Sequence, residues 1–174
     1  GVLDENAIIK ECNQTKTEAW LGGAAVLDKV KTIGKQYKEQ YENIEGICIS
    51  TAGMVDPEEG KIVFAGELMP GYTGTCIKKE LEKALEMPCE VENDVNCAGL
   101  AEYVSGSAKE SHIMFCATVG TGIGGCAIVN GRVFHGASNS ACEVGYIPMG
   151  DSDFQTLGAS SILVRKVAEK KIEP

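Results

Sequence analysis

The stretch CEVENDVNCAGLAE, residues 89–102, holds the clearest change of secondary-structure pattern in the sequence. CEVEN (89–93) has the composition of a strand, and DVNCAGLAEYVSG (94–106) has that of a helix. Asn93 and Asp94 stand at the junction, where open α/β sheets place the groups that bind ligands. Taken alone, the pair is better explained as a helix N-cap. A capped junction can still present the neighbouring carboxylate to a cleft, where it could accept a proton from a substrate hydroxyl.

Apolar runs and periodic apolar residues alternate on both sides of this stretch. They predict strands at 44–50 and 112–119, and helices at 15–42, at 75–86 and from 159 onward. Asn130-Gly131, between two extended segments, is a strong signal for a two-residue hairpin. The alternation of strands and helices, with hairpins among them, predicts an α/β protein with a mixed sheet. The composition changes near 105–109, which predicts a first lobe at 1–104 and a second at 105–174.

The composition excludes several classes of protein. The 174 residues carry a formal net charge of −9, which argues against non-specific binding to nucleic acid. No apolar run is long enough to span a membrane, and the first residues do not resemble a secretion signal. The eight cysteines are spread singly, mostly within apolar runs, so we expect buried, reduced thiols in a cytoplasmic protein rather than disulfides or zinc ligands.

Glycines concentrate in TVGTGIGG (118–125). Gly120, Gly122 and Gly125 match G-x-G-x-x-G, but extended residues follow instead of a helix, so a Rossmann dinucleotide site is excluded. The motifs that accompany a protein-kinase glycine loop or a Walker loop do not occur in the sequence. Two interpretations remain: a turn whose amides and Thr121 hydroxyl bind phosphate, or a tight hairpin that needs glycine for positive φ. We favour phosphate binding, because four glycines in six residues exceed what a turn requires.

A third polar segment, SACEVGYIPMG (140–150), contains Glu143 between small and apolar residues. A single glutamate in a loop is usually a solvated charge, so this segment alone does not indicate a function. His112 and His135 stand at the ends of predicted strands, and we expect both to be structural. The sequence contains neither a G-x-S-x-G nucleophile elbow nor an H-x-x-x-H metal motif.

Taken in order, these segments resemble the ROK family of sugar kinases. STAGMVDPEEGKI (50–62) is similar to the family's G-x-V-D-x-x-x-G segment, and VENDVNCAGLAE (91–102) to its signature E-N-D-x-N-A-x-x-L-x-E. VGTGIGGCAIVNGRVFHG (119–136) resembles the second phosphate loop with its hairpin, and ACEVGY (141–146) stands where the family has G-E-[IF]-G-[HY]. The resemblance implies an actin/Hsp70/hexokinase-like (ribonuclease H-like) ATPase fold, with mixed sheets flanked by helices.

The resemblance also implies roles for individual residues. Asp94 would be the general base that deprotonates the sugar hydroxyl attacking the γ-phosphate of ATP, which is used with Mg²⁺. Asn93 and Glu143 would bind sugar hydroxyls, and Gly53 and the loop that begins at Gly66 would border the sugar. The residues that would hold the nucleotide phosphates are Gly120, Thr121, Gly122 and Gly124. Relatives suggest a homodimer in the full-length protein, with a sugar and ATP as its small-molecule partners.

The sequence departs from the family pattern at the zinc site. Many members bind structural zinc through the histidine of G-E-x-G-H and a cysteine-rich run. This chain has Tyr146 at the histidine position, and GDSDFQTLGAS (150–160) contains no cysteine. We therefore expect no zinc, with Tyr146 beside the sugar in place of the histidine. The loop at 66–72 also departs from the usual Asn-Leu-x-x-Trp, so the identity of the sugar stays open.

Two segments of the family pattern have no counterpart in the sequence. The first phosphate loop, D-x-G-G-T, would precede residue 1, and the adenine-binding helices would follow residue 174. The resemblance therefore implies an internal fragment, truncated at both ends, which could be inactive in isolation. Two alternatives to a kinase remain: a sugar-sensing module of a transcriptional regulator, as in some family members, or a folded fragment without a ligand. Because a pure sensor needs neither Asp94 nor GTGIGG, these residues favour the kinase.

Overall fold

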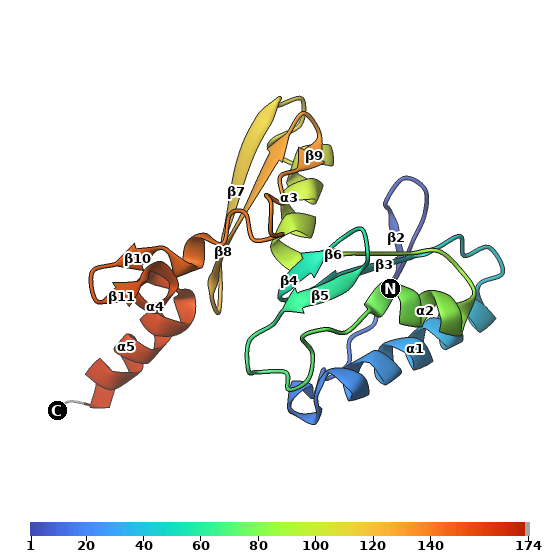
Figure 1. Cartoon of the computed structure of the whole chain (residues 1–174), viewed down its shortest axis with the longest axis horizontal. Helices are drawn as coiled ribbons and strands as arrows, with labels where there is room; N and C mark the ends of the chain where they lie inside the picture. Colours follow the sequence, from blue (N-terminus) through green and yellow to red (C-terminus); the bar gives the residue numbers. More distant parts are fainter. Residues whose placement is uncertain (173–174) are drawn as a thin grey trace. The chain divides into compact units, whose positions relative to one another are not determined.

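A computed structural model describes residues 1–172 and separates the chain into two compact units, Gly1–Glu92 and Asn93–Pro174. The α/β class is as predicted, since helices alternate with small two- and three-stranded sheets throughout the described residues (Figure 1). The contacts divide the chain earlier than the expected boundary after residue 104, because helix α3 (Asp94–Val104) packs on strands of the second unit. The assignment of separate functions to two lobes stays a prediction.

The first unit contains three strand pairs and two long helices. Its elements are β1 (Val2–Leu3), β2 (Ile9–Glu11), the short 3-10 helix η1 (Ala19–Leu21), α1 (Gly23–Gln40), β3 (Ile47–Thr51), β4 (Met54–Asp56), β5 (Lys61–Phe64), α2 (Ile77–Leu85) and β6 (Cys89–Asn93). β1 pairs with β2, β4 with β5, and β3 with β6. The helix expected over 15–42 begins only at Gly23, because the φ of 91° at Gly22 ends η1 and breaks the helical path.

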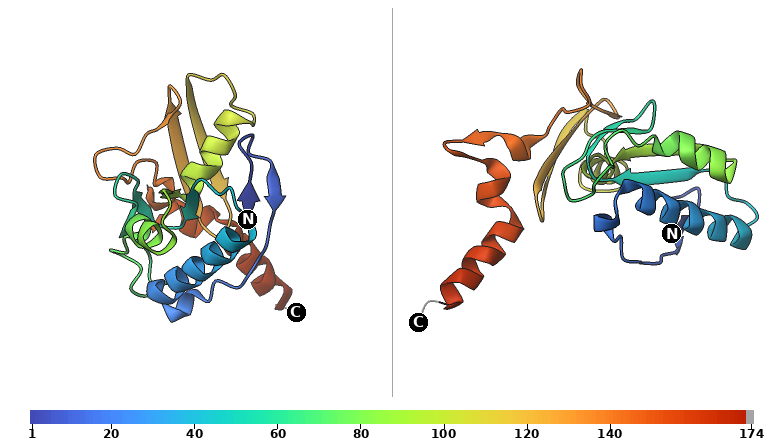
Figure 2. Two further views of the ribbon diagram at one scale, coloured as in Figure 1. Left: turned by 90° about the vertical axis from the view of Figure 1, so that its right-hand side faces the viewer. Right: turned by 60° about the horizontal axis from the view of Figure 1, so that its bottom comes forward.

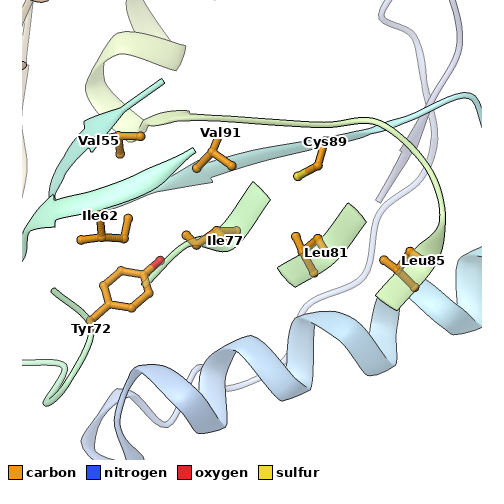
Figure 3. Packing of buried hydrophobic residues seen from close by; sticks show 8 residues of the cluster. All are labelled: Val55, Ile62, Tyr72, Ile77, Leu81, Leu85, Cys89 and Val91. Atoms are coloured by element: carbon orange, nitrogen blue, oxygen red, sulfur yellow. The ribbon is translucent and has the colours of Figure 1, made fainter. Parts of the chain in front are cut away.

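The core of the first unit lies where α2 meets the strands. α2 places Ile77, Leu81 and Leu85 at intervals of four residues, so all three side chains fall on one face and are buried. Figure 3 shows this face directed at Val91 and Cys89 of β6 and at the β4–β5 hairpin. α1 lies beside α2 and adds partly buried side chains to the same cluster (Figures 1 and 2). The helix ends at Leu85, where Glu86 adopts a left-handed conformation two residues before Pro88.

The second unit is built on a three-stranded antiparallel sheet with the order β7-β8-β9. Its elements are α3, β7 (Ile113–Val119), β8 (Ile123–Val129), β9 (Arg132–Val133), the 3-10 helix η2 (Val144–Tyr146), β10 (Pro148–Met149), β11 (Ser152–Asp153), α4 (Phe154–Gly158) and α5 (Ser160–Ile172). The predicted hairpin at Asn130-Gly131 is confirmed: both residues have positive φ, and β8 and β9 pair on either side of them.

α3 covers one face of this sheet and creates the second core. Met114, Cys126 and Ile128 are the buried residues of that core, with Val95 and Tyr103 among the side chains packed against it. The helix can approach this closely because residue 99 is glycine. A Cβ atom at Gly99 would stand 2.6 Å from the Cys126 Sγ.

The described thiols only partly match the expectation of burial. All eight cysteines are free. Cys89 and Cys126 are buried, but Cys12 and Cys48 are exposed, because Cys12 directly follows β2 and Cys48 lies on the exposed side of β3, outside the two cores. Within residues 1–172, no helix combines the length and apolar character that crossing a membrane requires.

The first core gives a direct stability prediction. Leu81→Ala removes a side chain with no exposed surface and should lower the free energy of unfolding by about 2–5 kcal/mol through lost burial and the resulting cavity. Urea unfolding followed by circular dichroism measures the loss. Leu68→Ala is the matched control, because Leu68 is 88% exposed. Equal losses in the two variants would contradict the packing described for α2.

Candidate functional site

Asn93 is the N-cap of α3 and fixes the start of the helix. Its Oδ1 accepts hydrogen bonds from the backbone amides of Val95 at 2.8 Å and Asn96 at 3.1 Å. The capping role that the sequence offered for this junction is thus present. Asp94 is the first helical residue and is exposed, and its Oδ1 lies 3.0 Å from the amide nitrogen of Val95. Asp94 is thus an acidic residue in the first turn of the helix, where the N-terminal end of the helix dipole attracts negative charge.

The glycine-rich segment forms a turn at 120–122 and then continues as strand. Gly124 and Gly125 lie within β8, so the turn is shorter than the glycine pattern suggested. None of Gly120, Gly122, Gly124 and Gly125 has a φ in the left-handed region. The interpretation that these glycines serve a hairpin requiring positive φ is therefore wrong. At Gly120 no heavy atom lies within 4 Å of a built Cβ, so packing does not require glycine there either.

The start of α5 holds the carbonyl groups of this turn. The Ser160 amide donates to the Gly120 carbonyl at 2.9 Å, and the Ser161 hydroxyl donates to the Thr121 carbonyl at 2.7 Å. The Gly120 amide donates across the turn to the Gly122 carbonyl at 2.9 Å. Among the described residues, no acceptor is hydrogen-bonded to the amides of Thr121 or Gly122. Two amide donors at the end of a hairpin can bind an anion such as a phosphate.

Glu143 is half-buried next to Asp94. Burial raises the pKa of the Glu143 carboxyl above its usual 4.5, and the negative charge of Asp94 raises it further. Glu143 precedes η2 without capping it, and within the described part of the chain no group donates a hydrogen bond to its carboxyl. The carboxyl is therefore able to accept hydrogen bonds from a ligand's hydroxyl groups.

Small residues bring these three segments together inside the second unit. A Cβ at Gly124 would stand 2.6 Å from Val95 Cγ2, so the first turn of α3 rests directly on β8 beside the turn. A Cβ at Gly125 would stand 2.6 Å from the Cys142 carbonyl oxygen, and one at Gly145 would collide with the Ile123 carbonyl oxygen. These contacts between neighbouring residues therefore fix the positions of Asp94, the glycine turn and Glu143 within the unit.

The remaining predicted residues are Tyr146 in the second unit and Gly53 and Gly66 in the first. Tyr146 ends η2 and its side chain is 55% exposed. Gly53 connects β3 with β4 in the first unit at a φ of 101°, and a Cβ there would approach the Phe64 carbonyl oxygen to 2.7 Å. Gly66 follows β5 in the same unit with open space around it.

The structure adds residues that sequence reasoning did not assign to the site. Gln155 of α4 places its Oε1 3.0 Å from a built Cβ at Gly122 and 3.2 Å from one at Gly145, so its side chain lies between the turn and η2. Ser160 and Ser161 support the turn through the bonds described above. The sequence carries only a weak signal for these three residues. They lie in a short helix and in a region rich in small residues, and no distinctive spacing marks them. Within residues 1–172, no three His, Cys, Asp or Glu side chains cluster as a metal site would need.

Comparison with known proteins places the chain among sugar-kinase relatives. The profile of the ROK family matches residues 1–159. An uncharacterized protein from Clostridium perfringens is 49% identical over 175 residues, which is 100% of this chain and 59% of that protein. A β-glucoside kinase from Listeria monocytogenes is 33% identical over 69% of this chain and 40% of its own length.

Solved structures share the fold. A ROK family glucokinase from Streptomyces griseus, in complex with glucose and AMPPNP, superposes with a TM-score of 0.85 at 24% identity, over 98% of this chain and 56% of that one. A ROK family transcriptional regulator, a homolog of the E. coli MLC protein, superposes with a TM-score of 0.71 at 23% identity, over 87% of this chain and 41% of that one. The chain thus spans about two-fifths to three-fifths of these proteins' length.

The family match covers nearly the whole chain and includes all three segments of the candidate site. The actin/hexokinase-like fold implied by the sequence resemblance agrees with the superposition on a ROK hexokinase from Thermus thermophilus, which has a TM-score of 0.70 at 28% identity over 92% of this chain and 55% of that one. This chain belongs to the ROK family.

Proposed function

We propose that this chain is the central portion of an ATP-dependent sugar kinase, which transfers the γ-phosphoryl group of ATP to a hydroxyl of a hexose or hexose-like sugar. The observation that carries the proposal is the grouping of Asp94, Glu143 and a glycine turn with two available amides in one unit. The kinase names of curated relatives support the same reaction class. The matching regions span only 39–40% of those enzymes, so we propose the activity for a longer protein that contains this chain.

Asp94 acts as the general base in this proposal. Its carboxylate takes the proton of the sugar hydroxyl as that oxygen bonds to the γ-phosphorus, and the bond from phosphorus to the bridging oxygen breaks to release ADP. The exposed position of Asp94 at the helix start makes the carboxylate accessible to a substrate. Mg²⁺ on the nucleotide would neutralise phosphate charge during the transfer.

The glycine turn holds nucleotide phosphates in this proposal. The amides of Thr121 and Gly122 donate to phosphate oxygens, and the Thr121 hydroxyl adds a further donor. Gly120 lets the phosphate approach the backbone, since no side chain fills that space. Gly124 contributes by letting α3 pack on β8, which sets the position of Asp94 relative to the turn.

The sugar is bound by polar side chains around Asp94. Glu143 accepts hydrogen bonds from sugar hydroxyls, and Asn93 and Tyr146 contact neighbouring ring positions. We also propose that Gly53 and Gly66 border the sugar, as the family resemblance implies. A site of this kind is selective, because a ligand without the matching hydroxyl leaves a half-buried carboxyl without a donor. We also infer a protein without zinc, in which Tyr146 stands where many members have a histidine, and a homodimer in the cytoplasm that binds neither nucleic acid nor membrane.

A sugar-sensing regulator is the alternative, and the superposition with a ROK regulator favours it at the level of the fold. The two functions differ in whether a bound nucleotide affects the binding of the sugar. Calorimetric titration of the full-length protein with hexoses and β-glucosides, with and without a non-hydrolysable ATP analogue, separates them. A kinase binds both the sugar and the analogue, with an effect of one on the affinity for the other, and releases ADP when ATP and a preferred sugar are supplied in a separate assay. A sensor binds sugar without any effect of nucleotide.

Removal of the proposed base should abolish most turnover. Asp94→Asn in the full-length protein should lower kcat by about 10²–10⁴ with sugar affinity largely retained, because the amide cannot accept the proton. ADP release gives kcat, and calorimetry gives the affinity. Asp151→Asn, at an exposed carboxylate of the same unit, is the control and should leave both unchanged. Retention of full turnover in Asp94→Asn would exclude Asp94 as the base.

Variants at Asn93 separate capping from sugar binding. Asn93→Ala removes the acceptor for two amides and should cost about 0.5–2 kcal/mol of folding stability. Asn93→Asp keeps the acceptor but removes the Nδ2 donor, so it should retain stability and lose sugar affinity. Thermal unfolding and sugar titration together test this. If Asn93→Asp binds sugar as the native protein does, the residue only caps the helix.

Glu143→Gln should raise the stability of the fold and lower the affinity for the sugar. Because the folded-state pKa of Glu143 is raised, its protonated form is favoured by folding, and this stabilisation is lost as the pH rises through that pKa. The variant should therefore unfold at a higher temperature than the native protein at pH 7, with the difference shrinking as the pH falls toward 4.5. Sugar affinity should fall at the same time. Glu110→Gln, at an exposed glutamate, is the control for both measurements.

A further inference from the structure

Cys116 of β7 and Cys126 of β8 stand directly opposite each other in the sheet of the second unit, and both are thiols in the structure. At the end of the same hairpin, the Asn130 amide donates to the carbonyl of His112 at 2.7 Å. Hydrogen-bonded pairs recur at every second position along an antiparallel ladder. Cys116 and Cys126 therefore also form a hydrogen-bonded pair, whose side chains lie on the same face of the sheet.

That face is the one covered by α3. Cys126 belongs to the second core and has no exposed surface, whereas Cys116 packs against this core and is only partly buried. A Cβ built at Gly99 of α3 would stand 2.6 Å from the Cys126 Sγ and 3.7 Å from the Cys116 Cβ. A single residue of the helix therefore lies above both thiols.

The geometry of such a pair allows a disulfide, but a strained one. A disulfide joins residues whose Cα atoms are about 4.4–6.8 Å apart, and the Cα atoms of a hydrogen-bonded antiparallel pair are about 5.5 Å apart. The Cβ atoms of such a pair are also about 5.5 Å apart, whereas a relaxed disulfide needs about 3.5–4.5 Å. The strands must therefore draw together locally. Strained disulfides are reduced more easily than structural ones, so a bridge at this position is reversible.

The first unit contains a pair of neighbouring thiols without this geometry. Cys48 and Cys89 lie on the paired strands β3 and β6. Cys89 is buried in the first core, whereas Cys48 is exposed between two residues that pack against that core. Their side chains therefore lie on opposite faces of the strands and cannot be joined. Burial also raises the pKa of the Cys89 thiol to about 11, so the reactive thiolate is scarce at neutral pH.

We propose that a peroxide oxidises Cys116 and Cys126 to a reversible disulfide, and that this bridge displaces the start of α3. Cys116 reacts first, because it is the partly exposed member of the pair. Its thiolate attacks one peroxide oxygen, the O–O bond breaks, and Cys116 becomes a sulfenic acid. The hydroxide released takes up the proton that Cys116 lost and becomes water.

The second step forms the bridge. The Cys126 sulfur bonds to the Cys116 sulfur, the S–O bond of the sulfenic acid breaks, and the hydroxide leaves as water with the proton of Cys126. The two thiols thus lose two electrons, which reduce one hydrogen peroxide to two waters.

The bridge needs space directly below Gly99. The Cys126 Sγ already fills part of that space, and the Cys116 atom nearest to a built Cβ at Gly99 is its Cβ. The Cys116 Sγ must therefore move toward the helix to form the bond. A core packed this closely accommodates an added atom by a shift of the backbone. α3 begins at Asp94, so its displacement moves Asp94 relative to the glycine turn. The expected effect on turnover rests on the proposed function.

Peptide mapping of the 174-residue chain tests the bridge without an assay of activity. Trypsin releases residues 110–132 as one peptide, in which Cys116 and Cys126 are the only cysteines. The folded chain is treated with hydrogen peroxide, alkylated with N-ethylmaleimide and digested without reduction. The peptide should then carry no label and be lighter than its reduced form by the mass of two hydrogens. Dithiothreitol before alkylation should restore the label at both cysteines.

Amide exchange measured by NMR tests the displacement of the helix. Oxidation should speed exchange of the α3 amides around Gly99 by at least about tenfold, with no change at the amides of α2. Cys116→Ser and, as a second variant, Cys126→Ala cannot form the bridge and should show no acceleration. Cys12→Ser, at an exposed thiol of the first unit, is the matched control and should respond as the native chain does. Circular dichroism confirms that each variant folds.

Turnover of the full-length protein connects the bridge with the proposed function. Peroxide should lower kcat by at least about tenfold, because a small displacement of a catalytic group is costly, and dithiothreitol should restore it. Cys116→Ser should keep the native kcat before and after peroxide. A full-length protein without kinase activity before oxidation would contradict the proposed function, whereas mapping and exchange would still decide whether the bridge forms and moves the helix.

Three results would overturn the proposal. The first is a peptide 110–132 that carries two labels after the folded chain has been treated with peroxide. The second is a sulfinic acid at Cys116 beside a thiol at Cys126, which would show oxidation without a bridge. The third is a bridge that leaves amide exchange in α3 unchanged, which would refute the displacement of the helix.

Discussion

The close packing of α3 on β8 is the constraint on which the candidate site depends. It requires two positions without side chains, Gly99 opposite Cys126 and Gly124 opposite Val95. A larger residue at either position would force the helix away from the strand, and the start of the helix would move with it. Asp94 is carried by that helix, whereas the glycine turn is carried by the strand. The distance between the proposed base and the proposed phosphate-binding amides is therefore set by a helix–sheet contact rather than by a flexible loop.

The sequence was sufficient to predict the end of a strand or helix where a local pattern ended abruptly. The strand 89–93 and the helix after it were predicted at the observed junction, because Asn93 both stops the apolar strand pattern and caps a helix. The Asn130-Gly131 hairpin followed from the need for two positive φ values. Local patterns were insufficient at Gly22, where the backbone turns although apolar residues continue with helical spacing. They also missed β10, β11 and α4, whose two to five residues are too short for any periodicity.

In the candidate site, too, local features could be predicted from the sequence and tertiary contacts could not. The position of Asn93 and Asp94 at a helix start could be predicted from the sequence, since capping is a local property. The closeness of Glu143 to Asp94 could not, because the two are connected only through η2, β8 and α3. The role of Gln155 between the turn and η2 is a tertiary contact as well. Family resemblance supplied an expectation for Glu143 that periodicity and composition could not supply.

The two hydrogen bonds that Asn93 Oδ1 accepts from backbone amides have an energetic consequence for any ligand that reaches Asp94. The cap fixes the backbone of the junction when the protein folds, so the loss of conformational freedom at this point is complete before a substrate arrives. A ligand then meets a carboxylate whose main chain is already immobile, and only side-chain rotation remains to be restricted. Preorganisation of this kind reduces the entropic penalty of forming a complex and leaves more of the interaction energy for orienting the reacting atoms.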